Sequence, residues 1–461
     1  MYSASLLLAA FCVFAVGCTA SSSSSIPASP RNVNDLSRWA NQQGVVMHDS
    51  LQWKQQKTKG NGDDDDTNDD NIGIELKESV EPGTVLLKVP RSIVFDALRI
   101  RNELEKESSE KVQKALEKLG QSGFDQHAEG FFIFVKVLRC CQEGESSLWS
   151  PYIQSLPRNF VEFSSAEKSC LTYYAKYIAD FQVQKFDAFC DAAVGSGLVD
   201  GSSTESSSKN EQARFAFCAV SSRFWKTSSS EERTAAIMKG TTPSPETDNA
   251  TSELVPVGDM FNHREPPNVA ITHEGDYVNF VYKGNAGAAD DQEDETKDLY
   301  ITYGQPSNPH RFLGIFGFVP VSDMPNLWSH LVYMDNPFTD DVEKMVFRTS
   351  DGGIPKQVWD AVLYALLEPK HPPNEPPEFT EQQHAKYRTY TADILKGHID
   401  KQLEELAALR DRIKMVEALG ISVNIGLIRQ HNEFLTDVFE KASNQIRLTG
   451  ELEEQIIETD E

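Results

Sequence analysis

Residues 254–264 form an apolar run, Leu-Val-Pro-Val-Gly-Asp-Met-Phe, that breaks into the polar tip Asn-His-Arg. An apolar run of this length is typical of a buried strand, and a polar tip then lies where a turn leaves the strand. Asp259, Asn262 and His263 would be presented by that turn. A short β-rich run follows at 298–303 and places Tyr303 where a strand gives way to a loop. These four side chains are the first candidates for a functional site.

The balance of charged residues argues against nucleic acid as a direct ligand. Lys and Arg total 44 against 70 Asp and Glu, which gives a formal net charge of −26 at pH 7. An acidic surface repels phosphate backbones, whereas it attracts a basic protein tail or a Lys-bearing substrate. Much of the excess lies in the runs 63–66 and 290–295, which are typical of solvated loops. We therefore expect no nucleic-acid partner, and the acidity alone does not identify a substrate.

The first twenty residues have the shape of a signal peptide. Residues 5–17 are apolar but short for a membrane span, and small residues follow at 18–20. No Lys or Arg precedes Arg31, so the usual positive charge is missing, and a membrane anchor or a buried terminus is the alternative. We expect entry into the secretory pathway, or a plastid reached through it by a bipartite leader. No stable membrane association is expected after the leader is removed.

The cysteine pattern predicts neither a zinc cluster nor a disulfide scaffold. Outside the leader the cysteines are odd in number and form no C-x-x-C pair. The acidic stretch 63–73 does not fit a calcium loop, because aligning Gly73 as the turn glycine puts Ile72 and Ser79 at ligand positions. We expect no metal site.

Hydrophobic periodicity predicts an α+β fold in which β-rich and helical segments occupy separate parts of the chain. The pattern at 33–43 predicts a short amphipathic helix. The runs 72–76 and 84–90 predict two strands, and Pro82-Gly83 predicts a hairpin turn between them.

Later segments alternate in the same way. Long helical patterns at 131–141 and 173–190 predict a helical insertion. Strand patterns return at 277–282 and 298–303, on either side of an acidic, Gly/Ala-rich hairpin loop. A helical packing face with Gly420 as C-cap is predicted from apolar residues at three- and four-residue steps: Leu403, Leu406, Leu409, Ile413 and Val416. The predicted parts are a leader at 1–20, a flexible linker at 21–34, the N-terminal part of a β-rich domain at 35–96, a helical insertion at 97–225, the C-terminal part of the β-rich domain at 226–325, and an all-helical domain at 326–461.

The order of motifs resembles a known enzyme family. The motifs are Trp149-Ser-Pro-Tyr-Ile-Gln-Ser-Leu-Pro157, the segment 216–225, Asp259-Met-Phe-Asn-His263, Tyr303-Gly304 and Gly317-Phe318. In this order, over roughly residues 33–440, the chain is similar to the Rubisco large-subunit methyltransferase-like branch of SET-domain protein-lysine methyltransferases. The resemblance implies a β-rich SET domain with a helical insertion, followed by a helical, substrate-binding-like domain. It also implies methyl transfer from S-adenosylmethionine to a lysine of a non-histone protein substrate, by a monomer.

The family's functional residues carry over to matching positions of this sequence. Tyr303 would be the catalytic residue. The resemblance implies cofactor-binding roles for Asp70, Asn71, Ile72, Arg223, Asp259, Asn262, His263, Phe316 and Phe318, and substrate-binding roles for Ser222, Arg223, Trp225, Asp259 and Tyr303. Taken alone, Arg223 would be a surface arginine at a helix end, Asp259 a cap, and the two phenylalanines ordinary core.

Two positions depart from the family pattern. The opening Gly-x-Gly is Asn71-Ile72-Gly73, and Asn tolerates the left-handed region that a glycine would occupy. Phe316 stands where related plant enzymes carry a tyrosine, so one hydroxyl near the target amine is missing and the number of methyl groups added is in doubt.

Two other functions stay open at this point. A histidine-directed relative places a small polar residue where this chain has Trp225, which favours a lysine pocket here. A non-catalytic SET scaffold that binds a protein partner is the other alternative. The joint presence of Asp259, Asn262, His263 and Tyr303 argues against it.

Overall fold

The computed structural model describes residues 32–56, 71–157, 161–200, 207–227, 251–264, 267–284, 297–303, 309–319, 331–333, 346–348, 351–367, 379–420 and 423–459. Helices and small sheets occupy separate parts of the chain, which confirms the predicted α+β class. The predicted leader and most of the predicted linker lie outside the described residues, as does Asp70.

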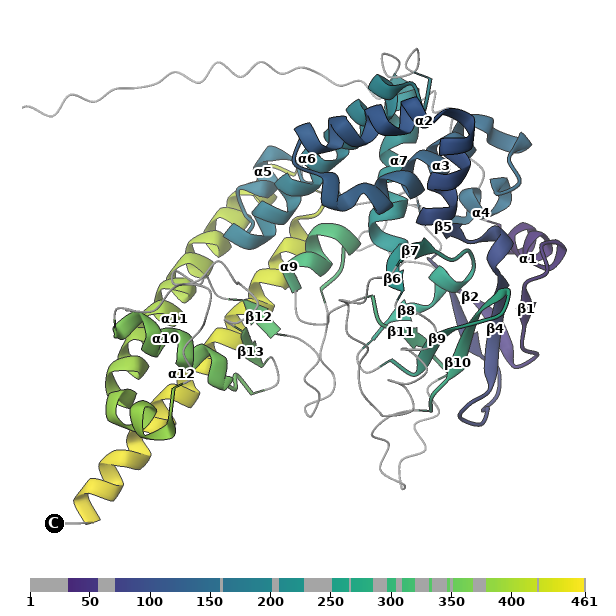
Figure 1. Cartoon of the computed structure of the whole chain (residues 1–461). Helices are drawn as coiled ribbons and strands as arrows, with labels where there is room; N and C mark the ends of the chain where they lie inside the picture. Colours follow the sequence, from purple (N-terminus) through teal and green to yellow (C-terminus); the bar gives the residue numbers. More distant parts are fainter. Residues whose placement is uncertain are drawn as a thin grey trace, which may run out of the picture.

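Small sheets build the β-rich part, at the right of Figure 1. A four-stranded sheet has the order β1-β4-β10-β9, a three-stranded sheet the order β5-β7-β6, and two further pairs are β2-β3 and β11-β8. The elements of this part are α1 (Val33–Gln42), β1 (Val46–Met47), β2 (Leu51–Gln56), β3 (Asn71–Leu76), β4 (Val85–Pro90), η1 (Arg91–Ile93), β5 (Phe95–Asp96), β6 (Trp225–Thr227), β7 (Thr251–Leu254), η5 (Gly258–Met260), β8 (Asn262–His263), β9 (Val269–Glu274), β10 (Tyr277–Tyr282) and β11 (Tyr300–Ile301).

Both predicted hairpins are wrong, although the strands exist. β3 pairs with β2, whereas β4 pairs with β1 and β10. β10 pairs with β9 and β4, and β11 pairs with β8 instead of β10. Tight hairpins have loops of a few residues, and the connections after β3 and β10 are longer than that, so each following strand joins another sheet. Gly83 does turn the chain, with φ of 91°, and its N–H donates to the Tyr282 carbonyl at 2.8 Å.

Helices between β5 and β6 cover the sheets, at the top of Figure 1. They are α2 (Ala97–Gln121), α3 (Ala128–Glu143), α4 (Ser150–Ser155), α5 (Ser165–Lys168), α6 (Tyr173–Ser196) and α7 (Ser207–Arg223). Their common core is aromatic: the Phe189 ring lies 5.5 Å from that of Phe131 and 5.7 Å from that of Phe217, edge to face in both cases.

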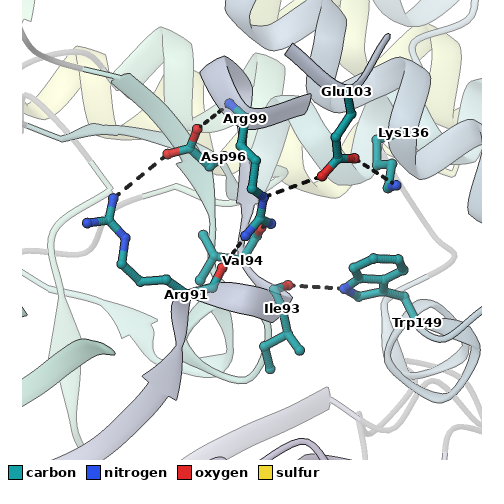
Figure 2. Close-up of polar contacts among 8 residues, drawn as sticks. All are labelled: Arg91, Ile93, Val94, Asp96, Arg99, Glu103, Lys136 and Trp149. Carbon is teal, nitrogen blue, oxygen red and sulfur yellow. Dashed lines mark hydrogen bonds and ion pairs between the residues drawn. The ribbon is translucent and has the colours of Figure 1, made fainter. Parts of the chain in front are cut away.

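Polar contacts anchor α2 and α4 to the segment 91–96, which joins α2 to the sheets (Figure 2). Asp96 caps α2 by accepting from the Arg99 N–H at 2.7 Å. The Trp149 indole, at the start of α4, donates to the Ile93 carbonyl at 3.0 Å. The ammonium of Lys136 lies 5.0 Å from the centre of the same indole, which ties α3 to this corner.

The C-terminal part contains long helices and one small sheet. Its elements are α9 (Pro309–Arg311), the π-helix η6 (Phe312–Phe316), β12 (Leu331–Tyr333), β13 (Val346–Arg348), α10 (Lys356–Leu366), α11 (Glu381–Ala418) and α12 (Ile425–Thr459). The predicted packing face is confirmed, since Leu406, Leu409, Ile413 and Val416 are buried on α11. The antiparallel pair β12-β13 shows that this part is not helical throughout.

The C-terminal helices α11 and α12 run side by side and reach the insertion near α5 and α6 (Figure 1). Ile413 and Ile428 share an apolar cluster with Leu171 and Leu313. The Asn432 side chain donates to the Cys170 carbonyl at 3.0 Å. Across the described ranges, no helix is long and apolar enough to cross a membrane.

Candidate active site

A parallel strand pair brings the two sequence motifs together. Tyr300 lies beside Asn262, and Ile301 beside His263, in the β8-β11 pair. Just past the pair, the Tyr303 N–H donates to Nδ1 of His263 at 3.2 Å. The phenol predicted for catalysis and the Asn-His tip therefore occupy adjacent positions on one edge.

The turn before this pair is strained. Val257 has a φ of 71°, which is unusual for a β-branched residue, and its side chain is fully buried. Strain of this kind persists only where the surrounding structure enforces it, and it concentrates at functional sites. Here it initiates η5, the short turn that carries Asp259.

Gly258 is required by the packing of this turn. A Cβ at position 258 would overlap the ring of Phe280, which is fully buried in β10. We expect Gly258→Ala to lower the free energy of unfolding by about 1–3 kcal/mol or more, the range for overpacked cores. Urea titration of the cofactor-free protein measures this.

Gly397→Ala is the matched control, because a Cβ at that position of α11 meets no atom within 4 Å other than those of the adjoining helix backbone. It should stabilise the protein by up to about 1 kcal/mol through helix propensity. Equal midpoints for the two variants would contradict the packing argument.

A buried ionic cluster surrounds Asp259. Its Oδ2 accepts from Nη1 of Arg223 at 3.0 Å and from the Tyr152 hydroxyl at 2.7 Å, and the same Nη1 donates to the Asp259 carbonyl at 2.9 Å. The Asp259 side chain is 1% exposed and that of Arg223 is 16% exposed. Burial raises the pKa of Asp259, and the charge of Arg223 and the Tyr152 hydrogen bond oppose that rise. Burial acts most strongly on the pKa of Arg223 and lowers it, but the Asp259 carboxylate and the Tyr152 and Tyr303 phenols together outweigh burial, so the net shift is upward.

Tyr303 presents its hydroxyl oxygen as an acceptor. Its O–H donates to the Phe261 carbonyl at 2.9 Å. Because the hydroxyl proton is used in this bond, the oxygen can only accept a hydrogen bond from a ligand. Burial raises the pKa of Tyr303 to about 12. The phenol is therefore neutral at physiological pH and does not act as a phenolate base.

Aromatic rings complete the wall beside Tyr303. The Phe316 ring lies 5.2 Å from the Tyr303 ring, and the Phe318 ring lies 6.1 Å from the His263 ring. The π-helix η6 and the left-handed Gly317, with φ of 75°, aim both phenylalanines at the site. A Cβ on Gly317 would overlap Val161, so this turn needs a glycine.

These groups line one cavity of about 530 Å³, a volume typical of ligand pockets. Nine of the predicted site residues line it: Ile72, Ser222, Arg223, Asp259, Asn262, His263, Tyr303, Phe316 and Phe318. The hydroxyl of Ser222 donates to the Cys218 carbonyl of its own helix at 2.8 Å.

Two predicted positions are not in the cavity wall. Trp225 pairs with Glu253 in β6 and packs against the main core, so no cavity contact supports its predicted role in substrate binding. Asn71 belongs to β3, opposite Gln56, and is not among the lining residues.

The cavity wall also contains a polar group that sequence reasoning missed. Lys54 donates to Asp298 at 2.5 Å and lies 3.4 Å from Glu75, and the Tyr300 hydroxyl donates to Asp298 at 3.2 Å. The Asp298 hydrogen bond and the nearby carboxylates raise the pKa of Lys54, although its partial burial opposes them. Lys54 lies in β2 and Asp298 in an isolated bridge to Glu75, far apart in the chain, and no local pattern links them.

No model of a known protein family matches the sequence, and no curated protein matches it. Among solved structures, the chain is similar to Rubisco LSMT bound to AdoMet, at 13% identity, with a TM-score of 0.50 and coverage of 91% of this chain and 92% of that chain. The fold is that of Rubisco LSMT.

Two further solved structures of LSMT are similar to the chain. They are the LSMT SET domain bound to lysine and AdoHcy, with 13% identity, a TM-score of 0.49 and 91% of each chain covered, and Rubisco LSMT bound to sinefungin and monomethyllysine, with 11% identity, a TM-score of 0.48 and 92% of each chain covered. The LSMT fold is the one predicted from the order of the motifs.

The described cysteines lie away from the cavity. Cys140, Cys141, Cys170, Cys190 and Cys218 are free thiols and lie outside the wall. Within the part of the chain that the structure describes, no group of three or more His, Cys, Asp or Glu side chains could hold a metal ion.

Proposed function

We propose that the chain is a protein-lysine N-methyltransferase that uses S-adenosylmethionine and acts on a non-histone protein. The observation that carries the proposal is that Tyr303 lines an aromatic-walled cavity and that its hydroxyl proton is bonded to the Phe261 carbonyl. The LSMT fold supports it, because the solved LSMT structures hold AdoMet, AdoHcy or lysine compounds.

Unsatisfied polar atoms of the cavity wall fit the amino-acid end of the cofactor. Among the described residues, Oδ1 of Asp259 and Nε of Arg223 are buried and have no hydrogen-bond partner. Buried polar atoms of this kind are costly unless a ligand satisfies them. One is an acceptor and the other a donor, which suits the ammonium and carboxylate of a methionyl group. Asn262 and the aromatic wall would hold the adenine.

The sulfonium methyl group of S-adenosylmethionine supplies an electrophilic carbon for a one-step, in-line displacement. The chain has to align the amine and to present it without its proton. Deprotonating a free lysine amine of pKa about 10.4 at pH 7 costs about 4.6 kcal/mol. Apolar walls at Phe316 and Phe318 lower that cost, because they disfavour the ammonium. Tyr303 would accept from the neutral amine and direct its lone pair.

Mass spectrometry tests the proposal directly. The purified chain is added to an undermethylated protein extract with deuterated-methyl AdoMet, and the modified residues are mapped. We expect labelled methyl groups on lysine. Label confined to histidine would favour the histidine-directed alternative, and no label in any extract, without AdoMet binding, would favour the scaffold.

Asn262→Ala should weaken AdoMet binding at least tenfold. The Asn262 side chain lines the cavity beside Gly73, and its loss leaves the adenine without an amide partner. Titration calorimetry measures the affinity, with wild-type protein expected to show a single site. Asn279→Ala, an amide substitution in β10 outside the cavity wall, serves as the control and should keep wild-type affinity. Equal affinities for Asn262→Ala and wild type would remove the adenine assignment.

A further inference from the structure

A tyrosine behind the cavity wall contacts the buried acid. Tyr152 is fully buried in α4, and its hydroxyl donates to Oδ2 of Asp259 at 2.7 Å. It is not among the residues that line the cavity. Tyr152 can therefore act on a bound ligand only through Asp259.

The surroundings of Tyr152 fix the direction of its hydroxyl. Its ring stacks on Trp39 at 6.0 Å and lies 6.2 Å from the Phe95 ring. The Trp39 indole donates to the Leu148 carbonyl at 2.7 Å. The Trp149 indole donates to the Ile93 carbonyl at 3.0 Å (Figure 2). Both bonds lie at the start of α4, so the helix and the phenol on it are anchored to α1 and to η1.

Tyr152 and Arg223 make different contributions to Asp259. The guanidinium, from the end of α7, supplies a positive charge that balances the carboxylate. The phenol adds no charge, but it occupies the same oxygen, Oδ2, and so restricts the rotation of the carboxylate. Oδ1 has no partner among the described residues. The two contacts together leave one defined oxygen for a ligand.

We propose that Tyr152 is a positioning residue, whose hydroxyl holds the Asp259 carboxylate ionised and oriented so that Oδ1 accepts a hydrogen bond from a cationic ammonium in the cavity. The inference rests on the proposed methyltransferase function. It concerns the ammonium of the cofactor's methionyl group.

Tyr152→Phe keeps the ring and removes the hydrogen bond. A donor to the ionised form lowers the pKa of an acid, so its loss should raise the pKa of Asp259 further. We expect the acidic limb of the pH profile of kcat/KM to move to higher pH by about one unit. Activity at alkaline pH should return to within a few-fold of wild type. A role in packing alone would lower activity at all pH values and leave the limb in place.

Other titratable groups could contribute to that limb. Asp259 faces Arg223 from α7, Tyr152 from α4 and Tyr303 from beyond β11, and the raised pKa values keep all three in one form at acidic pH. His263, Lys54, Asp298 and Tyr300 lie elsewhere in the wall. Asp259→Asn identifies the contribution of Asp259, because the pH dependence of kcat/KM that is due to Asp259 should be absent from this variant.

Trp39→Phe is the matched control. It removes the hydrogen bond to Leu148 and disturbs the stack on Tyr152, but it keeps the hydroxyl, so the limb should stay in place. An unchanged limb in Tyr152→Phe, or an equal shift in Trp39→Phe, would overturn the inference. If Tyr152→Phe does not fold, 3-fluorotyrosine at position 152 replaces it. As a stronger donor, the fluorinated phenol should move the limb downward.

A titration of the cofactor-free protein separates this inference from the proposed function. The carboxyl carbon of Asp259, labelled with ¹³C and assigned from Asp259→Asn, reports its pKa without turnover. A wild-type protein that neither binds AdoMet nor transfers methyl groups would refute the function. The NMR shift would still show whether Tyr152 sets the ionisation of Asp259, and an unchanged midpoint in Tyr152→Phe would refute the inference alone.

Discussion

Tyr303→Phe should lower the rate of lysine methylation by about two orders of magnitude or more, which corresponds to some 2.7 kcal/mol of transition-state stabilisation. The ring and its contact with Phe316 stay, so only the hydroxyl is lost. That oxygen is the acceptor left free once its proton is bonded to the Phe261 carbonyl. Affinity for AdoMet should change little. Single-turnover rates on a mapped substrate protein and calorimetry measure the two quantities.

Tyr300→Phe is the control for this prediction. Tyr300 lies in β11, three residues before Tyr303, and lines the same cavity, but its hydroxyl donates to Asp298 at 3.2 Å. Its loss should reduce turnover by no more than a few-fold. A Tyr303→Phe enzyme with wild-type turnover would refute the alignment role. If both variants lost turnover equally, the loss would reflect a general sensitivity of the cavity to the removal of either phenol. It would not then support a special role for Tyr303.

Local patterns were sufficient to predict several elements of the fold. The stripe from Leu406 to Val416 is buried because helix periodicity alone sets which side chains share a face. The strands at 72–76 and 277–282 exist for a similar reason, since β-type residues alternate or cluster there. Each of these patterns lies within one element, so no knowledge of its neighbours was needed.

Strand partners could not be predicted in the same way. β4 lies between β1 and β10, and the residue that pairs with Val89 is Val278, far away in sequence. A turn signal such as Pro82-Gly83 shows that the chain bends, but not which strand it joins afterwards. Pairing depends on which apolar faces meet in the folded core, a non-local property.

The same difference between local and non-local features applies to the candidate site. Motif resemblance identified Arg223, Asp259, Asn262 and Tyr303, and the cavity contains all four. Tyr152 was inside a recognised motif, but its bond to Asp259 depends on how α4 packs against η5. The Lys54 group of the wall has no motif, because its partners meet only through sheet formation.

Arg223→Met should lower the free energy of unfolding of the cofactor-free protein by about 3–5 kcal/mol at neutral pH, because it leaves a buried carboxylate without its counter-charge. The Asp259 side chain is 1% exposed, so water cannot replace the guanidinium. Arg214→Met, on the same helix, removes the partner of Glu162 at an exposed site, with side chains 50% and 52% exposed. That variant should lose less than about 1 kcal/mol. Urea titrations at constant salt compare the two.

The pH dependence and a double variant identify the buried charge as the cause. Burial already raises the pKa of Asp259 above its unfolded value, and removal of the guanidinium raises it further. Between the unfolded and folded pKa values the folded protein holds a proton that the unfolded chain releases, so stability falls as pH rises through that window. The deficit of Arg223→Met should therefore shrink as the pH is lowered toward the unfolded pKa of Asp259. Arg223→Met/Asp259→Asn carries no buried charge and should recover most of the loss at neutral pH. A deficit that is independent of pH and persists in the double variant would mean that Arg223 stabilises the fold by packing, and that the ion pair beneath the cavity contributes little.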